Sequence, residues 1–263
     1  MAHRTLGLAV TLAAALTLSP AHADSADEWG VVLPDAGCAQ AHSWVARVQG
    51  QNGVLDATVL GAHSPAIALA PAEQGAAGTR TIPGVGSVTG GYARTLAGTN
   101  CASHAEAGGS AVEIGVPHVA GAAGGYSLSP VGLRFGGFTV SATSTPGDRV
   151  RFGGQIVNGV VTSLGRKVLD LPVNMPANVG LRIPSDPGRP AFAQVVFNEQ
   201  VTTTADGTPA RGSAGSGWIN AARITVLGPV ATDVTIGHAA VIGTGPDGVL
   251  DFPCVGGAAR CAQ

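Results

Sequence analysis

Residues 191–204, with the sequence AFAQVVFNEQVTTT, and residues 131–142, with the sequence VGLRFGGFTVSA, decide the fold class. Both stretches are rich in valine, phenylalanine and threonine, whose branched or aromatic side chains favour extended strands. Five more stretches have a similar composition, and these are residues 43–48, 54–60, 150–161, 219–227 and 233–242. The sequence therefore predicts seven β-strands.

Turn-forming pairs separate these stretches, and helix signals are nearly absent after the first residues. Examples are Asn52-Gly53, Asn158-Gly159 and Asp206-Gly207, in which asparagine, aspartate and glycine permit tight turns. Many short strands joined in this way are typical of an all-β fold, here an antiparallel β-sandwich or a barrel-like sheet. A β-solenoid fits less well, because the sequence has no fixed repeat period. Residues 71–91 and 108–125 are rich in glycine and alanine and are expected to be long loops.

The first 23 residues have the pattern of a secretory signal peptide. Arg4 supplies a positive charge, residues 6–18 form a short apolar run, and Ala21-His22-Ala23 is a small-x-small cleavage site. No later apolar stretch is long and unbroken enough to span a bilayer. The expected location is therefore extracellular, with the protein either free or retained at the cell envelope.

The expected domain organisation follows from this signal. Residues 1–23 are the signal peptide, and residues 24–263 form a single β-rich extracellular domain. Within that domain we expect an N-terminal extension over 24–42, a β core over 43–252 and a disulfide-closed tail over 253–263.

Four cysteines, Cys38, Cys101, Cys254 and Cys261, remain after cleavage of the signal. An even number in an exported chain predicts two disulfides, because an oxidising compartment preserves them. Three pairings are possible, of which Cys38–Cys101 with Cys254–Cys261 is favoured. The spacing does not match a zinc site, and neither a metal nor a cofactor is expected.

The charge of the chain excludes some classes of partner. It has 14 basic and 16 acidic side chains and a formal net charge of −2. Such a balance provides no basic surface for nucleic acid and no polybasic segment for anionic lipid. The expected partner is an envelope component or another protein of unknown identity.

The C-terminal half resembles the choice-of-anchor P proteins, which are exported proteins of actinobacteria. The resemblance extends over about residues 131–242 and rests on five segments: 150–159 (VRFGGQIVNG), 171–178 (LPVNMPAN), 195–200 (VVFNEQ), 218–223 (WINAAR) and 232–239 (TDVTIGHA). It implies an exported or surface-associated protein and no particular chemistry. The chain departs from the family in its C-terminal residues, 254–263, which do not have the pattern of an anchor.

Signatures of known catalytic sites are absent from the sequence: it has no G-x-S-x-G elbow, no H-E-x-x-H helix and no phosphate-binding loop. Strand alternation instead predicts that Glu199, Asn220 and His238 lie on the apolar faces of three successive strands. Burial of such groups without partners is costly, so we expect a hydrogen-bonded network that fixes the register of the sheet. The candidate network or binding residues are Asn198, Glu199, Gln200, Asn220, Arg223 and His238.

Two alternatives assign chemistry to these residues. Glu199 and His238 are suitable for general acid–base catalysis, as in a secreted hydrolase or lyase. Lys167 is expected to share a face with Leu169 and Leu171, where it could form an intramolecular amide bond with an asparagine of the network, assisted by Glu199. The favoured interpretation is that the protein is not an enzyme but a secreted or envelope-associated β-rich protein with a structural or interaction role.

Overall fold

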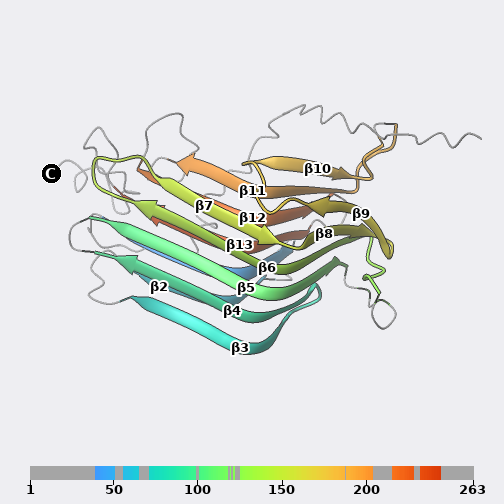
Figure 1. The fold of residues 1–263 in the computed structure, drawn as a ribbon, viewed down its shortest axis with the longest axis horizontal. Coiled ribbons are helices and arrows are strands. Elements are labelled where there is room, and N and C mark those ends of the chain that lie inside the picture. The colour runs from blue at the N-terminus through green and yellow to red at the C-terminus, as the bar shows by residue number, and fades with distance from the viewer. Residues whose placement is uncertain are drawn as a thin grey trace, which may run out of the picture.

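The computed structural model describes residues 39–50, 56–64, 71–98, 101–117, 119, 121, 125–186, 188–203, 215–227 and 232–243. This part of the chain contains β-strands and no helix, and the strands form two antiparallel sheets packed against each other (Figure 1). The all-β prediction is confirmed in its β-sandwich form. The predicted signal peptide and the segments around Cys38, Cys254 and Cys261 lie outside the described residues.

The six-stranded sheet combines the first two strands with the last four. Its order is β10 (Val179–Ile183), β11 (Ala193–Thr203), β12 (Ser216–Val226), β13 (Thr232–Ile242), β1 (Gln40–Gly50) and β2 (Asp56–Ser64). Because β1 pairs with β13, residues near the two ends of the described chain are neighbours in the middle of the sheet.

The seven-stranded sheet is formed by the strands between them. Its order is β3 (Ala72–Ile82), β4 (Gly86–Ala97), β5 (Ser103–Val116), β6 (Val131–Ser144), β8 (Gly159–Ser163) and β9 (Arg166–Leu171), and β7 (Arg151–Val157) also pairs with β6. All seven predicted strands are present in the two sheets. The predicted strand 150–161 is divided into β7 and β8 at Asn158, which has a φ of 50°.

The prediction of a loop is wrong for residues 71–91 and for the first half of 108–125, whereas the described residues of 117–125 are in no strand. These stretches contain β3, the first half of β4 and the last nine residues of β5. The buried side chains in these stretches are branched ones, such as Ile82, Val88 and Val112, whereas Ala77 and Ala111 are exposed. The branched residues are separated by many glycines and alanines, which are not distinctive of strands, so the strand pattern is weak in the sequence.

The main core lies between the two sheets. Its largest buried side chains come from both of them and include Phe135, Ile114 and Leu133 on one side and Phe197, Ile224 and Ile236 on the other. Burial of each such side chain contributes about 1.5–3 kcal/mol. This interior is the main source of stability that the described residues provide.

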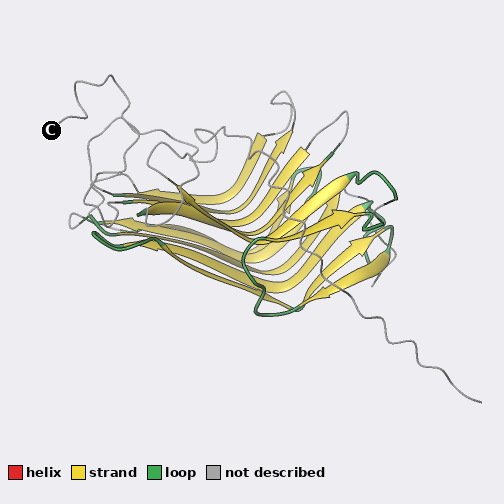
Figure 2. Ribbon diagram, turned by 90° about the horizontal axis from the view of Figure 1, so that it is seen from above, coloured by secondary structure: helices red, strands yellow, loops and turns green. Residues whose placement is uncertain are grey.

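The strands of both sheets bend part-way along their length, so that the sandwich has the shape of an elbow (Figure 2). The six-stranded sheet lies on the inner side of the elbow and the seven-stranded sheet on its outer side. The strand lengths agree with this arrangement, because β5 and β6 have 14 residues whereas β12 and β13 have 11.

One row of residues crosses the six-stranded sheet at this bend. The cross-strand pairs on either side place the following residues opposite one another: Leu60, Val45, Gly237, Ala221 and Asn198, which we call the bend row. Leu60, Gly237 and Asn198 have φ values of 50°, 62° and 47°. A left-handed residue therefore occurs on every second strand of the row.

The bend row reverses which residues face the main core. Val195 and Phe197 belong to that core, whereas Val201, further along the same strand, packs in a separate cluster with Trp218 and Ala240. Alternation along this strand predicts that Glu199 lies on the apolar face that carries Val195 and Phe197, and this prediction is wrong. Simple alternation holds only where a strand is regular. The regular pairing of β2, β1, β13, β12 and β11 is interrupted at the bend row.

No helix in the described ranges is long and apolar enough to cross a membrane.

We predict that Gly237→Ala destabilises the protein by about 3 kcal/mol or more, because two penalties add. A left-handed φ disfavours alanine, and a Cβ atom would lie 2.7 Å from Cδ2 of the buried Phe138 and closer still to its Cε2. Urea unfolding followed by tryptophan fluorescence measures the change. Gly78→Ala is the matched control, since no atom lies within 4 Å of its Cβ position, and we expect a change below about 1 kcal/mol. Equal effects of the two substitutions would contradict this account of the bend.

Candidate functional site

A row of polar and aromatic residues lies next to the bend row, on the face of the six-stranded sheet that points away from the main core. Glu199 is opposite Asn220, Asn220 is opposite His238, and His238 is opposite Trp44. This face is the inner side of the elbow (Figure 2). The bend thus brings side chains of β11, β12, β13 and β1 together in a concave angle.

Hydrogen bonds connect three of these side chains with a fourth, His42 of β1, and we call the four the polar chain. His42 and His238 have their Nε2 atoms 3.1 Å apart. His238 Nδ1 is 2.7 Å from Asn220 Oδ1, and Asn220 Nδ2 donates to Glu199 Oε2 at 2.8 Å. Asn220 and His238 are almost completely buried, with exposed fractions of 0% and 1%.

The directions of these bonds are linked. Since Asn220 donates from Nδ2, its Oδ1 accepts the proton of His238 Nδ1. A neutral His238 then has an unprotonated Nε2, which accepts from His42. All three bonds of the polar chain therefore point toward the carboxylate of Glu199, an arrangement in which each bond polarises and strengthens the next.

Aromatic rings pack along the same face. The rings of Trp44 and His238 are stacked, with centroids 3.8 Å apart and planes 8° apart. His42 stacks on Trp44 at 5.2 Å, and Trp218 lies 6.1 Å from His238. The guanidinium of Arg47 lies 5.5 Å from the centre of the Trp44 ring. His238 is therefore held between its hydrogen-bond partners and two tryptophans.

Charged groups lie at the Glu199 end of the polar chain. Arg223 lies 3.7 Å from Glu199 Oε1 and 3.8 Å from Asp233 Oδ1. Burial raises the pKa of Glu199 above its ordinary value, and this effect outweighs the opposing influence of Arg223 and Asn220. Burial, together with His42 and the nearby arginines, lowers the pKa of His238 well below its ordinary value. Both shifts favour the neutral forms of the two groups.

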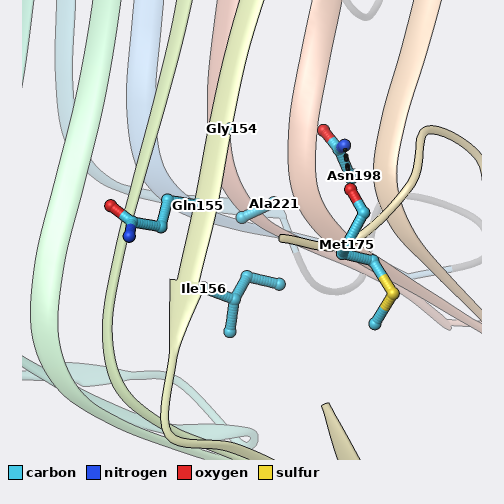
Figure 3. A pocket seen from close by; sticks show the side chains of 6 residues that line it. All are labelled: Gly154, Gln155, Ile156, Met175, Asn198 and Ala221. Carbon is cyan, nitrogen blue, oxygen red and sulfur yellow. Dashed lines mark hydrogen bonds between the residues drawn. The ribbon is translucent and has the colours of Figure 1, made fainter. Parts of the chain in front are cut away.

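Two candidate residues, Asn198 and Gln200, are directed away from the polar chain. Asn198 belongs to the bend row and donates from Nδ2 to the backbone oxygen of Met175 at 2.8 Å (Figure 3). Gln200 donates to Asn198 Oδ1 at 2.9 Å. The hollow beside Asn198 and Met175 has a volume of about 10 Å³, enough for about one water molecule. These residues hold a connecting segment and do not form a ligand site.

That connecting segment contains a second asparagine with a similar role. Asn178 Oδ1 accepts from the backbone N–H of Gln200 at 2.8 Å, and its Nδ2 donates to the oxygen of the same residue at 3.1 Å. The stretches 171–178 and 195–200, which are separate in the sequence, are therefore in direct contact.

Three polar atoms on the inner side of the elbow have no hydrogen-bond partner among the residues that the structure describes. They are Nε1 of Trp44 and both ring nitrogens of His63, and all three atoms are buried. His63 lies opposite His42 in the pairing of β1 with β2. Burial lowers the pKa of His63, so its neutral form is favoured as well.

Lys167 is not buried, in contrast to the prediction. Its ammonium donates to Asp170 at 2.7 Å, and about half of its side chain is exposed. A register shift between β8 and β9 places Lys167 opposite Thr162, which breaks the simple alternation expected for this strand. Glu199, Asn198 and Asn220 belong to the other sheet, so the proposed amide bond has no structural support.

Cys101 is the only cysteine among the described residues, and it is not a free thiol. Because the other three cysteines lie outside those residues, the pairings Cys38–Cys101 and Cys254–Cys261 stay predictions.

His42, Trp44 and Trp218 take part in the site but were not candidates from the sequence. His42 and His238 are 196 positions apart, and only the pairing of the first strand with the last brings them together. The one sequence signal for the first two is the pattern His42-x-Trp44, but the predicted strand 43–48 begins after His42, which falls in the predicted N-terminal extension. In the structure β1 begins at Gln40 and contains both residues.

No protein-family model, no curated protein and no solved structure matches this chain.

We predict that Asn220→Ala lowers the free energy of unfolding by about 3 kcal/mol or more, because it leaves two buried groups unpaired at about 1–3 kcal/mol each. These groups are Glu199 Oε2 and His238 Nδ1. Thr225→Ala on the same strand is the control, since its hydroxyl bonds only the partly exposed Asp233; we expect a loss of about 1 kcal/mol. Chemical denaturation measures both. If Asn220→Ala were no worse than its control, the polar chain would not be stabilising.

The pKa shifts predict the pH dependence of stability. A histidine whose pKa is lowered by folding contributes stability above about pH 6.5, and this contribution is lost as the pH falls. Glu199 acts in the opposite sense, because its raised pKa favours the folded state as the pH falls toward that pKa. His238 and His63 act together, so we expect stability to decrease from pH 7 to pH 5.

Glu199→Gln separates these contributions, because it removes the charge but keeps an acceptor for Asn220. The decrease should become steeper in this variant, up to about 1.4 kcal/mol per pH unit for each histidine. Urea titrations at pH 7, 6 and 5 measure the slopes. A flatter profile in Glu199→Gln than in the wild type would show that the signs are assigned incorrectly.

Proposed function

We propose that this protein is a non-enzymatic β-sandwich module of the bacterial exterior, with a structural or binding role. One observation carries the proposal: the side chains best suited to acid–base chemistry are hydrogen-bonded to other side chains of the protein. Glu199, Asn220 and His238 form a continuous series of hydrogen bonds with His42. A general acid or base must instead reach a proton of its substrate.

The position of the polar chain supports an architectural role for it. The polar chain runs across β11, β12, β13 and β1, immediately beside the bend row. At the bend row the backbone departs from regular strand pairing, so the backbone hydrogen bonds specify the strand register less well. The side-chain hydrogen bonds of the polar chain stabilise the register there. The two described hollows, beside Asn198 and beside His104, are lined by neither Glu199 nor His238.

The location outside the cell is supported by the sequence. The pattern of residues 1–23 is that of an export signal, the four cysteines favour an oxidising compartment, and the resemblance to choice-of-anchor P proteins points the same way. A β-sandwich in this location would interact with an envelope polymer or with another exported protein.

The test uses the full chain expressed in a bacterium that exports it. We expect the protein to appear in the medium or the envelope fraction with the mass of residues 24–263, and to hydrolyse no glycoside, ester or peptide substrate above the buffer rate. Intact-mass spectrometry and substrate panels measure these two properties. Retention of the full-length chain in the cytoplasm would contradict the location.

Glu199→Gln is the decisive variant for the non-enzymatic assignment. It keeps the hydrogen bond to Asn220, so its circular dichroism should match that of the wild type. Turnover of any substrate that this variant abolishes, while remaining folded, would overturn the proposal in favour of acid–base catalysis.

A further inference from the structure

A hollow of about 380 Å³ lies on the outer face of the seven-stranded sheet, away from the polar chain. Its volume is within the range of small-molecule sites, about 300–1,000 Å³. Three neighbouring strands, β5, β6 and β7, contribute its wall. The residues that line it include His104, Glu106, Thr139, Ser141, Gln155 and Gly153.

Hydrogen bonds already orient the groups around the carboxylate of Glu106. Tyr92 donates its hydroxyl proton to Glu106 Oε1 at 2.5 Å, and burial together with Glu106 raises the pKa of Tyr92 to about 12, so the tyrosine remains a donor at neutral pH. His104 Nε2 lies 3.7 Å from Glu106 Oε2, and its Nδ1 is 2.9 Å from Thr143 Oγ1. Glu106 therefore presents Oε2 in a fixed position, with about a quarter of its side chain exposed.

The hollow exists because β7 has a glycine where the wall would otherwise continue. Gly153 is exposed and lies opposite Ser141, which in turn lies opposite Glu106. A Cβ atom at Gly153 would lie 2.8 Å from Ser141 Oγ, at the far end of a short side chain that can rotate. A larger residue at this position would fill the hollow without entering the core.

The charges nearby exclude several classes of ligand. The neighbouring guanidinium groups of Arg94 and Arg151 form ion pairs with Glu73 at 3.1 Å and with Asp148 at 3.3 Å, so Glu106 is the carboxylate that a ligand meets. An anionic ligand would be repelled by it. Within the described residues no three metal-ligating side chains are grouped, so a metal ion lacks a ligand set.

The remaining groups suit a neutral ligand with many hydroxyls. A carboxylate oxygen accepts hydrogen bonds, the amide of Gln155 both donates and accepts, and so do the hydroxyls of Ser141 and Thr139. A sugar hydroxyl also donates and accepts, and therefore pairs with each of them. An apolar ligand would leave these polar groups unsatisfied.

We propose that this hollow binds a short segment of a neutral carbohydrate chain, with Glu106, Ser141 and Gln155 bonding its hydroxyls and Gly153 providing the space. The inference rests on the proposed function and names its ligand class. On this proposal the outer face of the elbow binds the ligand, and the polar chain on the inner face stabilises the fold.

Three variants of the full chain test the site. Gly153→Val fills the hollow, and Glu106→Gln removes the charge while keeping an acceptor for Tyr92. Gly78→Val is the matched control, because it also adds a side chain to an exposed glycine of the same sheet and has no atom within 4 Å of its Cβ position. Circular dichroism and urea midpoints establish that each variant is folded.

The probes are immobilised neutral glycans (α-glucan, β-glucan, mannan, galactan and arabinan) and two anionic ones (polygalacturonate and heparin), followed by calorimetry with the matching neutral hexasaccharide. We expect the wild type and Gly78→Val to bind at least one neutral glycan equally well. Gly153→Val and Glu106→Gln should each weaken binding by about tenfold or more, since a hydrogen bond to a charged group is lost or blocked. Binding of no neutral glycan, preference for the anionic glycans, or full binding by Gly153→Val would overturn the assignment.

The same samples are assayed for new reducing ends, which separates this inference from the proposed function. If no neutral glycan is bound or cleaved, the carbohydrate site is wrong and the non-enzymatic assignment stands. If a glycan is cleaved in a manner that depends on Glu199, the non-enzymatic assignment is wrong, and the effect of Gly153→Val on binding still decides the role of the hollow.

Discussion

The structure depends on one backbone constraint. In each strand the alternate residues that face the main core change from one set to the other at the bend, and neighbouring strands must make this change at the same row. If a single strand did so alone, its side chains would oppose the wrong face of its partners beyond that point. The bend row meets the constraint across β2, β1, β13, β12 and β11, with Leu60, Gly237 and Asn198 in left-handed conformation. The elbow shape and the separation of the two apolar clusters both follow from this row.

The polar chain follows from the same constraint. Beyond the bend, residues that would have joined the main core face the concave angle, where side chains from adjacent strands converge. Glu199, Asn220 and His238 occupy this angle and satisfy one another, while Trp44 covers His238 by stacking. A buried polar series of this kind specifies which strands pair, because any other neighbour would leave a buried donor or acceptor without a partner.

The sequence is informative about the strands and misleading about their faces. Branched residues predict β6, β11 and β13, but β3 and the first half of β4 are rich in glycine and alanine, which are not distinctive of strands, and similar residues separate the valines and isoleucine of β5. The faces of Glu199 and His238 were assigned by unbroken alternation, which the bend row interrupts. Asn198 and Gly237 are residues that tolerate left-handed backbone, whereas Leu60 has no such signal, and the 196-position separation of His42 from His238 lies beyond any local pattern.

The bend row also has a geometric consequence for the outer sheet. Because the bend crosses five neighbouring strands at one row, the inner sheet turns along a single line. The strands of the outer sheet bend with it (Figure 2), so the exposed face of that sheet is convex along its strands. An extended polymer bound along these strands would therefore have to curve around the elbow.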